Sequence, residues 1–374
     1  MKGKANKKGW PIVAICYDFD KTLSPKDMQD YSLLPKLNCP AAEFWPQSNA
    51  LAREQGMDKI LSYMHLIITK ARAKDVRITQ KDFRAMGKEI ELFRGVDTWF
   101  DRIDAIAESL RVNVEHYIIS AGLKEIVEGT PIARYFTEIY ASSFVYSKYG
   151  EPIWPRQVVN YTTKTQYLFR ISKNCLDLGD EDSVNEYIGD DERRIPFRNF
   201  IYIGDSETDI PAMKIVKNGG GTSIGVYNAE SGSLDRVRKL LEQKRIDYLL
   251  PADYGQGSRL ERVVSDIIRK IDADENLNSL NRVQSAYVRE LEEIEYLEKY
   301  TKTFLENNEL SEEEAENIER QAQDILRRAK RRLHQYEEFA PNVTNDRFIA
   351  EVSEKVMRLF GSAHDRGKER GENG

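Results

Sequence analysis

The sequence predicts an α/β fold: a parallel β-sheet with crossover helices, a helical insertion after the first strand and a helical extension at the C-terminus. Three observations predict it. Short apolar runs rich in β-branched residues alternate with amphipathic segments over residues 111–265, which is typical of strands joined by helices. Residues 24–110 carry mainly helical periodicity. After residue 277 the composition shifts toward Glu, Lys, Arg, Leu and Ala.

The first predicted strand is the apolar run of residues 12–17, and Asp18 and Asp20 follow it directly. Open α/β sheets bind ligands at the carboxyl ends of their strands. In an extended segment, side chains two residues apart point the same way. The two carboxyl groups can therefore reach one phosphorus atom, which one attacks while the other moves a proton.

The insertion is predicted to be helical over residues 41–110. Its apolar residues recur largely at spacings of three and four: Leu51, Ile60, Leu61, Met64, Ile67 and Ile68, then Phe83, Met86, Ile90 and Phe93. His65 lies four residues after Leu61 and three before Ile68, so we expect it to pack in the core.

Strands and helices alternate beyond residue 111. The apolar runs predict strands at residues 114–119, 200–203, 223–227 and 247–250, and a hairpin at residues 139–159. Helices are predicted at residues 123–135, where Gly129 and Pro131 interrupt the pattern, at residues 165–172, and after each later strand. Residues 177–194 are mostly acidic or polar, which predicts a surface loop. Together these elements predict a parallel sheet with right-handed crossovers.

The C-terminal extension, residues 277–361, contains two predicted amphipathic helices that fold back as a hairpin. Their apolar residues again lie three and four apart: Val283, Tyr287, Leu291, Ile294 and Leu297, then Ala315, Ile318, Ala322, Ile325, Ala329, Leu333 and Tyr336. Such stripes are usually buried against each other, the core or a second copy. A homodimer or a protein partner bound through these helices therefore stays open. The polar residues 362–374 are expected to be disordered.

Composition excludes several classes of protein. The 374 residues carry a net charge of −6, which disfavours a nucleic-acid partner. The first apolar run is broken by Asp18 and Asp20, so neither a signal peptide nor a membrane span is predicted. Cys16, Cys39 and Cys175 lack the spacing of a zinc or redox pair. They suit buried thiols in a reducing cytoplasm, where we expect the protein to reside.

Four polar groups follow one another along the chain: Asp18 with Asp20, Ser120, Lys164, and Asp205 with Asp209. Phosphoryl transfer needs an in-line nucleophile, positive charge, a metal and donors that orient the phosphate. Asp205 and Asp209 could join Asp18 as oxygen ligands of a hard ion such as Mg²⁺. Lys164 would offset the repulsion among these carboxylates. A second Gly-Asp pair at residue 190 follows polar residues instead of a clear strand, which favours Asp205.

In this order the motifs resemble those of the haloacid dehalogenase (HAD) superfamily of aspartyl-phosphate hydrolases, over roughly residues 10–265. The first motif is Asp18-x-Asp20-x-Thr22, the second is the Ser120 strand end, the third is Lys164, and the fourth is Gly204-Asp205-x-x-x-Asp209. The resemblance implies a Rossmann-like core of residues 10–23 and 111–265. It also implies a helical cap of residues 24–110, similar to that of phosphoserine-phosphatase-like members.

The resemblance further implies a role for each residue. Asp18 is the nucleophile, and Asp20 protonates the leaving oxygen and then activates water. Ser120, with Ala121 and Gly122, and Lys164 hold the phosphate, and Thr22 orients the loop. Mg²⁺ is the implied cofactor, held by Asp18, by the backbone carbonyl of Asp20 and by Asp205, with Asp209 supporting it directly or through water.

An acid at position 20 favours ester hydrolysis, because an ester oxygen needs a proton to leave and a halide does not. The expected function is a magnesium-dependent phosphatase of a small phosphorylated molecule. Phosphomutases share this acid, so phosphoryl transfer stays open. Two further alternatives are a regulatory or scaffolding protein with a ligand-sensing core and partner-binding C-terminal helices, and a phosphatase of phosphoprotein or nucleic-acid ends.

The cap is expected to exclude water and select the substrate. Its candidate contacts are charged residues of the predicted helices and their connections: Glu43, Arg53, Lys70, Arg72 and Arg94. The segment between Ser120 and Lys164 is predicted to form one helix and a hairpin. It is too short to contain a second α/β cap.

Overall fold

Seven strands form one sheet in the order β4-β3-β2-β1-β5-β6-β7. All neighbours pair in parallel except β3 and β4, which form the predicted hairpin at one edge. The strands are β1 (Ile12–Tyr17), β2 (Asn113–Leu123), β3 (Phe136–Tyr146), β4 (Pro152–Gln157), β5 (Phe200–Gly204), β6 (Thr222–Tyr227) and β7 (Tyr248–Pro251). The predicted α/β fold class is therefore confirmed, with one antiparallel edge strand.

The computed structural model describes residues 6–230 and 234–307, together with isolated positions between 317 and 354. The chain divides into two compact units after Ala273. The sheet belongs to the first unit.

Strand β1 lies at the centre of the sheet and pairs with β2 on one side and β5 on the other. The chain runs from β1 outward through β2, β3 and β4, and then returns to the opposite side of β1 to continue with β5. The direction of strand addition thus reverses at β1. In open α/β sheets the crevice at such a reversal, beyond the carboxyl ends of the strands, is the usual ligand site.

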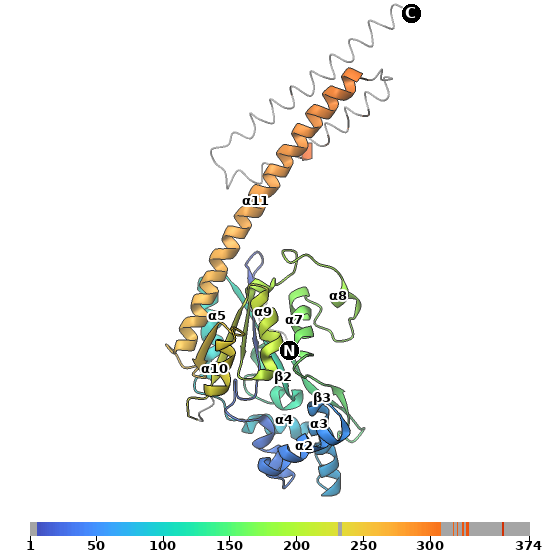
Figure 1. Ribbon diagram of the computed structural model, residues 1–374, viewed down its shortest axis with the longest axis vertical. Helices are drawn as coiled ribbons and strands as arrows, with labels where there is room; N and C mark the ends of the chain where they lie inside the picture. The colour runs from blue at the N-terminus through green and yellow to red at the C-terminus, as the bar shows by residue number, and fades with distance from the viewer. Residues whose placement is uncertain are drawn as a thin grey trace, which may run out of the picture. The chain divides into compact units, whose positions relative to one another are not determined.

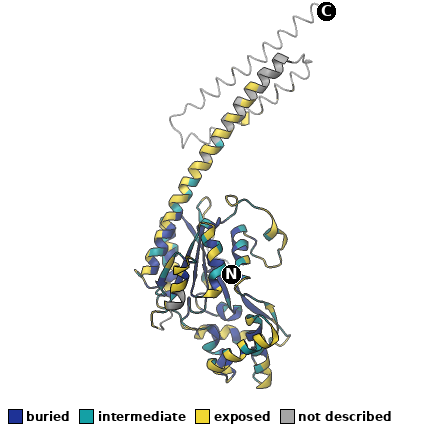
Figure 2. Ribbon diagram, in the orientation of Figure 1, coloured by how far each residue is buried: buried dark blue, intermediate teal, exposed yellow. Residues whose placement is uncertain are grey.

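Helices cover both faces of the sheet and enclose two apolar clusters. On one face lie α5 (Val96–Ser109) and the first turns of α11 (Arg259–Asn307), which bury Trp99, Phe100 and Val264 among other side chains. On the other face lie α7 (Lys164–Lys173), α9 (Ile210–Asn218) and α10 (Leu234–Glu242). Figure 2 shows the central strands between these layers, among them β1, β2 and β5, as mostly buried.

The insertion between β1 and α5 is helical, as predicted. It consists of η1 (Met28–Asp30), α1 (Leu33–Lys36), α2 (Ala41–Gln55), α3 (Lys59–Ala73), α4 (Gln80–Met86) and η2 (Gly87–Glu89). Figure 1 shows α2, α3 and α4 gathered at one end of the sheet unit. Their apolar faces, which include Phe44, Met64, Ile67 and Phe83, join the apolar cluster that also contains α5.

One local prediction is confirmed and another is wrong. The helix predicted over residues 123–135 is interrupted at Gly129 and Pro131, as expected: α6 (Lys124–Glu128) ends before the break and a separate short helix, η3 (Ala133–Tyr135), follows it, whereas His65 does not pack in the core. The backbone of α4 comes so close to Gly129 that a Cβ there would lie 1.8 Å from the carbonyl oxygen of Arg84. His65 is exposed, because Tyr63, Met64 and Ile67 turn the buried face of α3 away from it.

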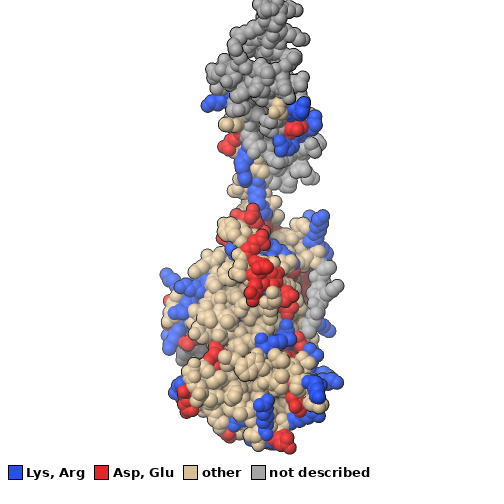
Figure 3. Space-filling model, turned by 90° about the vertical axis from the view of Figure 1, so that its right-hand side faces the viewer, with Lys and Arg blue, Asp and Glu red and all other residues tan. Residues whose placement is uncertain are grey.

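The loop predicted at residues 177–194 lies at the surface and includes only a short helix, α8 (Asp182–Asn185). Two further short helices are η4 (Phe197–Asn199) and η5 (Glu207–Asp209). Figure 3 shows acidic side chains gathered on the upper half of the sheet unit, on the side from which α8 projects in Figure 1. All three cysteines are free and buried, as predicted.

The second unit contains the rest of α11, which continues to Asn307. Several apolar side chains on it are exposed: Leu277, Leu280, Val288 and Tyr296. The predicted second helix of the hairpin and the tail of residues 362–374 lie outside the described residues, apart from isolated helical positions such as Asp324. Within the described part of the chain, no helix is both long and apolar enough to cross a bilayer.

Candidate active site

Asp18 and Asp20 lie on a tight loop after β1. The backbone N–H of Asp18 continues the strand by donating to the carbonyl of Ile203 in β5. The chain then turns sharply, because the N–H groups of residues 22, 23 and 24 all donate to the carbonyl of Phe19. Lys21 takes a left-handed conformation with φ of 59° in this turn. A bidentate ion pair with Asp27, at 2.7 and 2.9 Å, holds the Lys21 side chain in place.

One carboxylate oxygen of Asp20 is held by a hydrogen bond, and the other lies beside Gly122 in the loop of the second motif. Its Oδ1 accepts a 2.7 Å hydrogen bond from the N–H of Met28. Its Oδ2 lies 3.0 Å from the position that a Cβ on Gly122 would occupy. Burial, and then the charges of Asp27 and Asp18, raise the pKa of Asp20 well above its ordinary value. A carboxyl group in that state can carry a proton at neutral pH.

Ser120, Ala121 and Gly122 lie at the carboxyl end of β2, directly beside β1. The Ser120 hydroxyl is fully buried and accepts a 3.1 Å hydrogen bond from the N–H of Gly122. This bond shapes the loop. It leaves the hydroxyl proton of Ser120 available to a phosphate oxygen.

Lys164 is the first residue of α7 and is completely buried. Its ammonium group contacts Asp18 Oδ1 at 3.0 Å and Asp209 Oδ1 at 2.7 Å. Burial disfavours its charge, but these two carboxylates outweigh burial and raise the pKa of Lys164. The lysine is therefore a fixed positive charge beside the proposed nucleophile.

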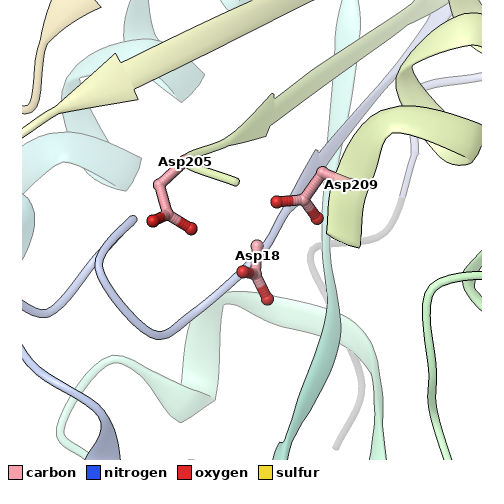
Figure 4. Close-up of side chains that lie close together, drawn as sticks. All are labelled: Asp18, Asp205 and Asp209. Atoms are coloured by element: carbon pink, nitrogen blue, oxygen red, sulfur yellow. The ribbon is translucent and has the colours of Figure 1, made fainter. Parts of the chain in front are cut away.

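Asp205 and Asp209 follow β5, and with Asp18 they point toward a common centre (Figure 4). Carboxylate oxygens of the three residues lie within 4.8 Å of one another. Asp209 is saturated, since its oxygens accept from Lys164, from the Tyr202 hydroxyl at 2.8 Å, and from the N–H and hydroxyl of Ser206. It therefore fits a supporting role better than a direct metal ligand.

Asp205 is the carboxylate that lacks protein partners. Only 9% of it is exposed, and none of the hydrogen bonds or ion pairs between described residues reaches its side chain. Burial, and then Asp18 and Asp209, raise its pKa well above the ordinary value. The same causes, burial and Asp209, raise the pKa of Asp18 to about 6 although Lys164 opposes them. Three buried carboxylates against one lysine leave an excess of negative charge that a divalent cation would neutralise.

The insertion reaches this site through two residues that the sequence did not single out. The Tyr63 hydroxyl of α3 donates a 2.7 Å hydrogen bond to the carbonyl of Ala121. The Met28 side chain lies against Gly122, where a Cβ would come within 2.2 Å of Met28 Cε. Both side chains are almost completely buried. They cover the loop of Ser120, Ala121 and Gly122 from the insertion side.

The charged cap residues named from the sequence form other contacts. Lys70 pairs with Glu43 at 3.5 Å, and Arg94 pairs with Asp253 at 3.4 Å at a largely exposed position. Arg53 is exposed, and Arg72 lines a cavity of about 280 Å³ bordered by the β3–β4 connection, away from the carboxylates. Asp190, the alternative acid, is 83% exposed and pairs with Arg193.

Comparisons with known proteins identify relatives of the first unit. A family model described as haloacid dehalogenase-like hydrolase matches residues 15–214. An uncharacterized protein of Borreliella burgdorferi is 27% identical over 276 residues, covering 67% of this chain and 94% of that protein.

Solved structures resemble the chain at low sequence identity. A substrate-bound phosphoserine phosphatase is 13% identical, with a TM-score of 0.40 and coverage of 63% of this chain and 99% of that one. A phosphoserine phosphohydrolase-like protein of Francisella tularensis is 16% identical, with a TM-score of 0.35 and coverage of 62% and 99%. A HAD family hydrolase of Salmonella enterica serovar Typhi is 17% identical, with a TM-score of 0.35 and coverage of 66% and 69%.

Proposed function

The chain belongs to the haloacid dehalogenase-like hydrolase family, and from this membership and the site geometry we propose that it is a magnesium-dependent phosphatase. The proposed reaction hydrolyses a phosphate monoester through a phosphorylated Asp18. One observation carries the proposal: Asp18, Asp205 and Asp209 are buried together, and among the described residues Lys164 is the cation that contacts two of them, while the nearby Lys21 is paired with Asp27. Carboxylates that serve only for folding are seldom buried with such an excess of charge.

The residues present fit a hard divalent ion. Asp205 has no donor among the described side chains, and Asp18 uses only one oxygen for Lys164. We therefore assign Mg²⁺ to the carboxylates of Asp18 and Asp205 and the backbone carbonyl of Asp20, with Asp209 behind them. When bound, Mg²⁺ would neutralise negative charge on the phosphoryl oxygens.

In the first step, a carboxylate oxygen of Asp18 attacks the phosphorus atom. A bond forms between Asp18 and phosphorus while the bond from phosphorus to the ester oxygen breaks. Asp20 donates its proton to that departing oxygen, which leaves as an alcohol. The raised pKa of Asp20 suits this transfer, because the group must hold a proton before the step.

In the second step, Asp20 accepts a proton from water as the water oxygen attacks the phosphorus atom. The bond between phosphorus and Asp18 breaks, inorganic phosphate leaves, and both acids return to their starting states. Lys164, the Ser120 hydroxyl and the backbone around Ala121 and Gly122 provide positive charge and donors for the phosphoryl oxygens.

The substrate is expected to be a phosphorylated small molecule. Met28 and Tyr63 cover the Ser120 loop closely, so the insertion must move to admit a ligand or leave room only for a small one. The charged substrate contacts first expected on the cap are not supported by their positions. Transfer of the phosphoryl group to a second substrate molecule would use the same residues, so product analysis distinguishes it from hydrolysis.

Hydrolysis of p-nitrophenyl phosphate tests the proposal. We expect the wild-type protein to act only with Mg²⁺, and Asp18→Asn to lose activity by about 10³-fold or more, because an amide cannot accept the phosphoryl group. Asp190→Asn is the matched control, since Asp190 also follows a glycine but lies at the surface. Equal rates for Asp18→Asn and wild type would rule out Asp18 as the nucleophile.

Assays with a panel of phosphorylated compounds, peptides and oligonucleotides distinguish the remaining alternative functions. Activity confined to phosphopeptides or nucleic-acid ends would favour a macromolecular substrate. A wild-type protein that binds but does not hydrolyse any of them would favour a regulatory or scaffolding role. The complete set of motif acids at the site supports catalysis over that alternative.

A further inference from the structure

A tyrosine from outside the family-matched region reaches the catalytic loop. Tyr254 follows β7, beyond the matched residues 15–214. Its side chain is completely buried, and its hydroxyl donates a 2.9 Å hydrogen bond to the backbone carbonyl of Thr22. Thr22 belongs to the Asp18–Ser24 turn, which carries both proposed catalytic acids.

Tyr254 is itself held from several sides. Its N–H donates to the carbonyl of Arg94 at 3.0 Å, and its own carbonyl accepts from the guanidinium of Arg102. Arg102 also pairs with Glu261 in the first turn of α11 at 2.5 Å. The Trp99 ring meets the Tyr254 ring edge-on, with centroids 5.0 Å apart. A side chain with this many contacts has little freedom to follow a moving loop.

Trp99, which packs against Tyr254, also contacts the residue that precedes the turn. The indole N–H of Trp99 donates to the Tyr17 hydroxyl at 2.9 Å, and Tyr17 immediately precedes Asp18. An indole N–H can only donate, so the Tyr17 hydroxyl is the acceptor of this bond. The same hydroxyl is hydrogen-bonded to His116 Nδ1 at 3.0 Å. Trp99 therefore fixes the turn before Asp18, while Tyr254 fixes it after Asp20.

The hydrogen bond from Tyr254 reaches Thr22 next to the part of the turn with the least favourable backbone conformation. Three successive N–H groups share the carbonyl of Phe19, and Lys21 occupies the left-handed region with φ of 59°, which is unfavourable for a residue other than glycine. Next to Thr22 in the turn, the carbonyl of Leu23 accepts a hydrogen bond from the N–H of Phe93. Burial, and then the charges of Asp205 and Asp18, raise the pKa of Tyr254, so its hydroxyl stays protonated and remains a donor.

We propose that Tyr254 is a positioning residue: its hydrogen bond to Thr22 keeps the Asp18–Ser24 turn in the conformation that aligns Asp18 and Asp20 for phosphoryl transfer. Tyr254 touches neither substrate nor reacting atoms, so it acts through the turn. The expected effect of Tyr254 on kcat rests on the proposed function. Its expected effect on the conformation of the turn does not. It assigns a role in the site to a segment that the family match does not include.

The test compares Tyr254→Phe with Tyr140→Phe in the full chain. Tyr140 is the matched control, because it too is a buried tyrosine whose hydroxyl donates to a backbone carbonyl, that of Leu176. The substitution Tyr254→Phe keeps the ring that contacts Trp99 and removes only the hydroxyl group. Two quantities are measured: hydrogen exchange of the peptide covering residues 18–24, and kcat and KM for p-nitrophenyl phosphate with Mg²⁺.

We expect Tyr254→Phe to speed exchange in residues 18–24 and to lower kcat about 5- to 50-fold at nearly unchanged KM, because a small misplacement of reacting groups is costly. Tyr140→Phe should change neither quantity. The proposal is overturned if the two variants behave alike, or if Tyr254→Phe raises exchange equally in β1, β2 and β5, which indicates general destabilisation. A wild-type protein without hydrolase activity would refute the proposed function, and the exchange measurement would still decide the role of Tyr254.

Discussion

Gly204, the last residue of β5, illustrates at the scale of one residue why the fourth motif contains a glycine. The Asp209 carboxylate lies directly against it: a Cβ at this position would be 2.6 Å from Asp209 Oδ2 and 2.7 Å from Cγ. Such distances are far below van der Waals contact. The glycine therefore allows Asp209 to come close enough to hold Lys164, which in turn contacts Asp18.

We predict that Gly204→Ala displaces Asp209 and lowers kcat by about 10- to 100-fold, because Lys164 loses the partner that places it beside Asp18. The measurement is steady-state hydrolysis of p-nitrophenyl phosphate. Gly179→Ala is the control, since a Cβ there meets only Asp177, at an ordinary 3.5 Å. Equal activity in the two variants would show that Asp209 tolerates displacement.

Sequence patterns located the acids of the site but not their surroundings. Asp18, Asp20 and Asp205 could be identified because each follows an apolar strand, and strand ends meet at one edge of a parallel sheet. Tyr63 and Tyr254 could not, because their contacts with Ala121 and Thr22 join segments far apart in the chain. His65 is exposed although its neighbour Met64 is buried, and the three-four spacing of apolar residues does not distinguish these two positions.

At the scale of elements, the start of α3 is joined to the start of α7. Asp58 caps α3 through 2.8 and 3.2 Å hydrogen bonds from the N–H groups of Ile60 and Leu61. Its other oxygen accepts a 2.9 Å bond from the Asn160 side chain. Asn160 in turn accepts hydrogen bonds from the N–H groups of residues 162 and 163, just before Lys164. The insertion is thereby connected to the helix that carries Lys164.

We predict that Asp58→Ala lowers the free energy of unfolding by about 1–2 kcal/mol, the usual effect of losing a helix cap. It should also speed hydrogen exchange in residues 160–166. Denaturant unfolding and exchange measurements check both effects. Thr79→Ala, which removes the cap of α4, serves as the control and should lose similar stability without affecting residues 160–166. Unchanged exchange there in Asp58→Ala would mean that the Asn160 contact is dispensable.

The elements themselves are largely predictable from the sequence. Strands β1, β2 and β5 and the β3–β4 hairpin follow from their apolar and β-branched residues. The end of α6 follows from Gly129 and Pro131, which interrupt the helical pattern. The close approach of Gly129 to the backbone of Arg84 cannot be predicted in this way, because it joins segments that meet only in the folded chain.

At the scale of the whole molecule, the second unit is the part whose role stays open. Within α11, Ile271 is the last buried side chain among the described positions, and Leu277, Leu280 and Val288 are exposed. Spaced three and eight residues apart, these three lie on one face of the helix. A homodimer contact or a protein partner, the two possibilities that the sequence leaves open, would cover such a face.

We predict that a chain truncated after residue 276 keeps the thermal midpoint of the sheet unit within about 2 °C, because the removed residues contribute no described buried side chain. Calorimetry measures the midpoint, and light scattering measures the mass of both chains. A full-length protein of higher mass than one chain, reduced to one chain by truncation, would place the oligomer contact in the second unit. One chain per particle in both proteins would exclude a homodimer.

The central position of β1 has a consequence for how the protein is made. β1 is synthesised first, yet its neighbours in the sheet are β2, which begins at Asn113, and β5, which begins at Phe200. Until both have left the ribosome, the nascent chain carries an apolar strand with unpaired edges, which is prone to aggregation. The early α2–α4 segment can form local helical structure during this interval, and chaperones that bind nascent apolar segments would act on β1 in the same period.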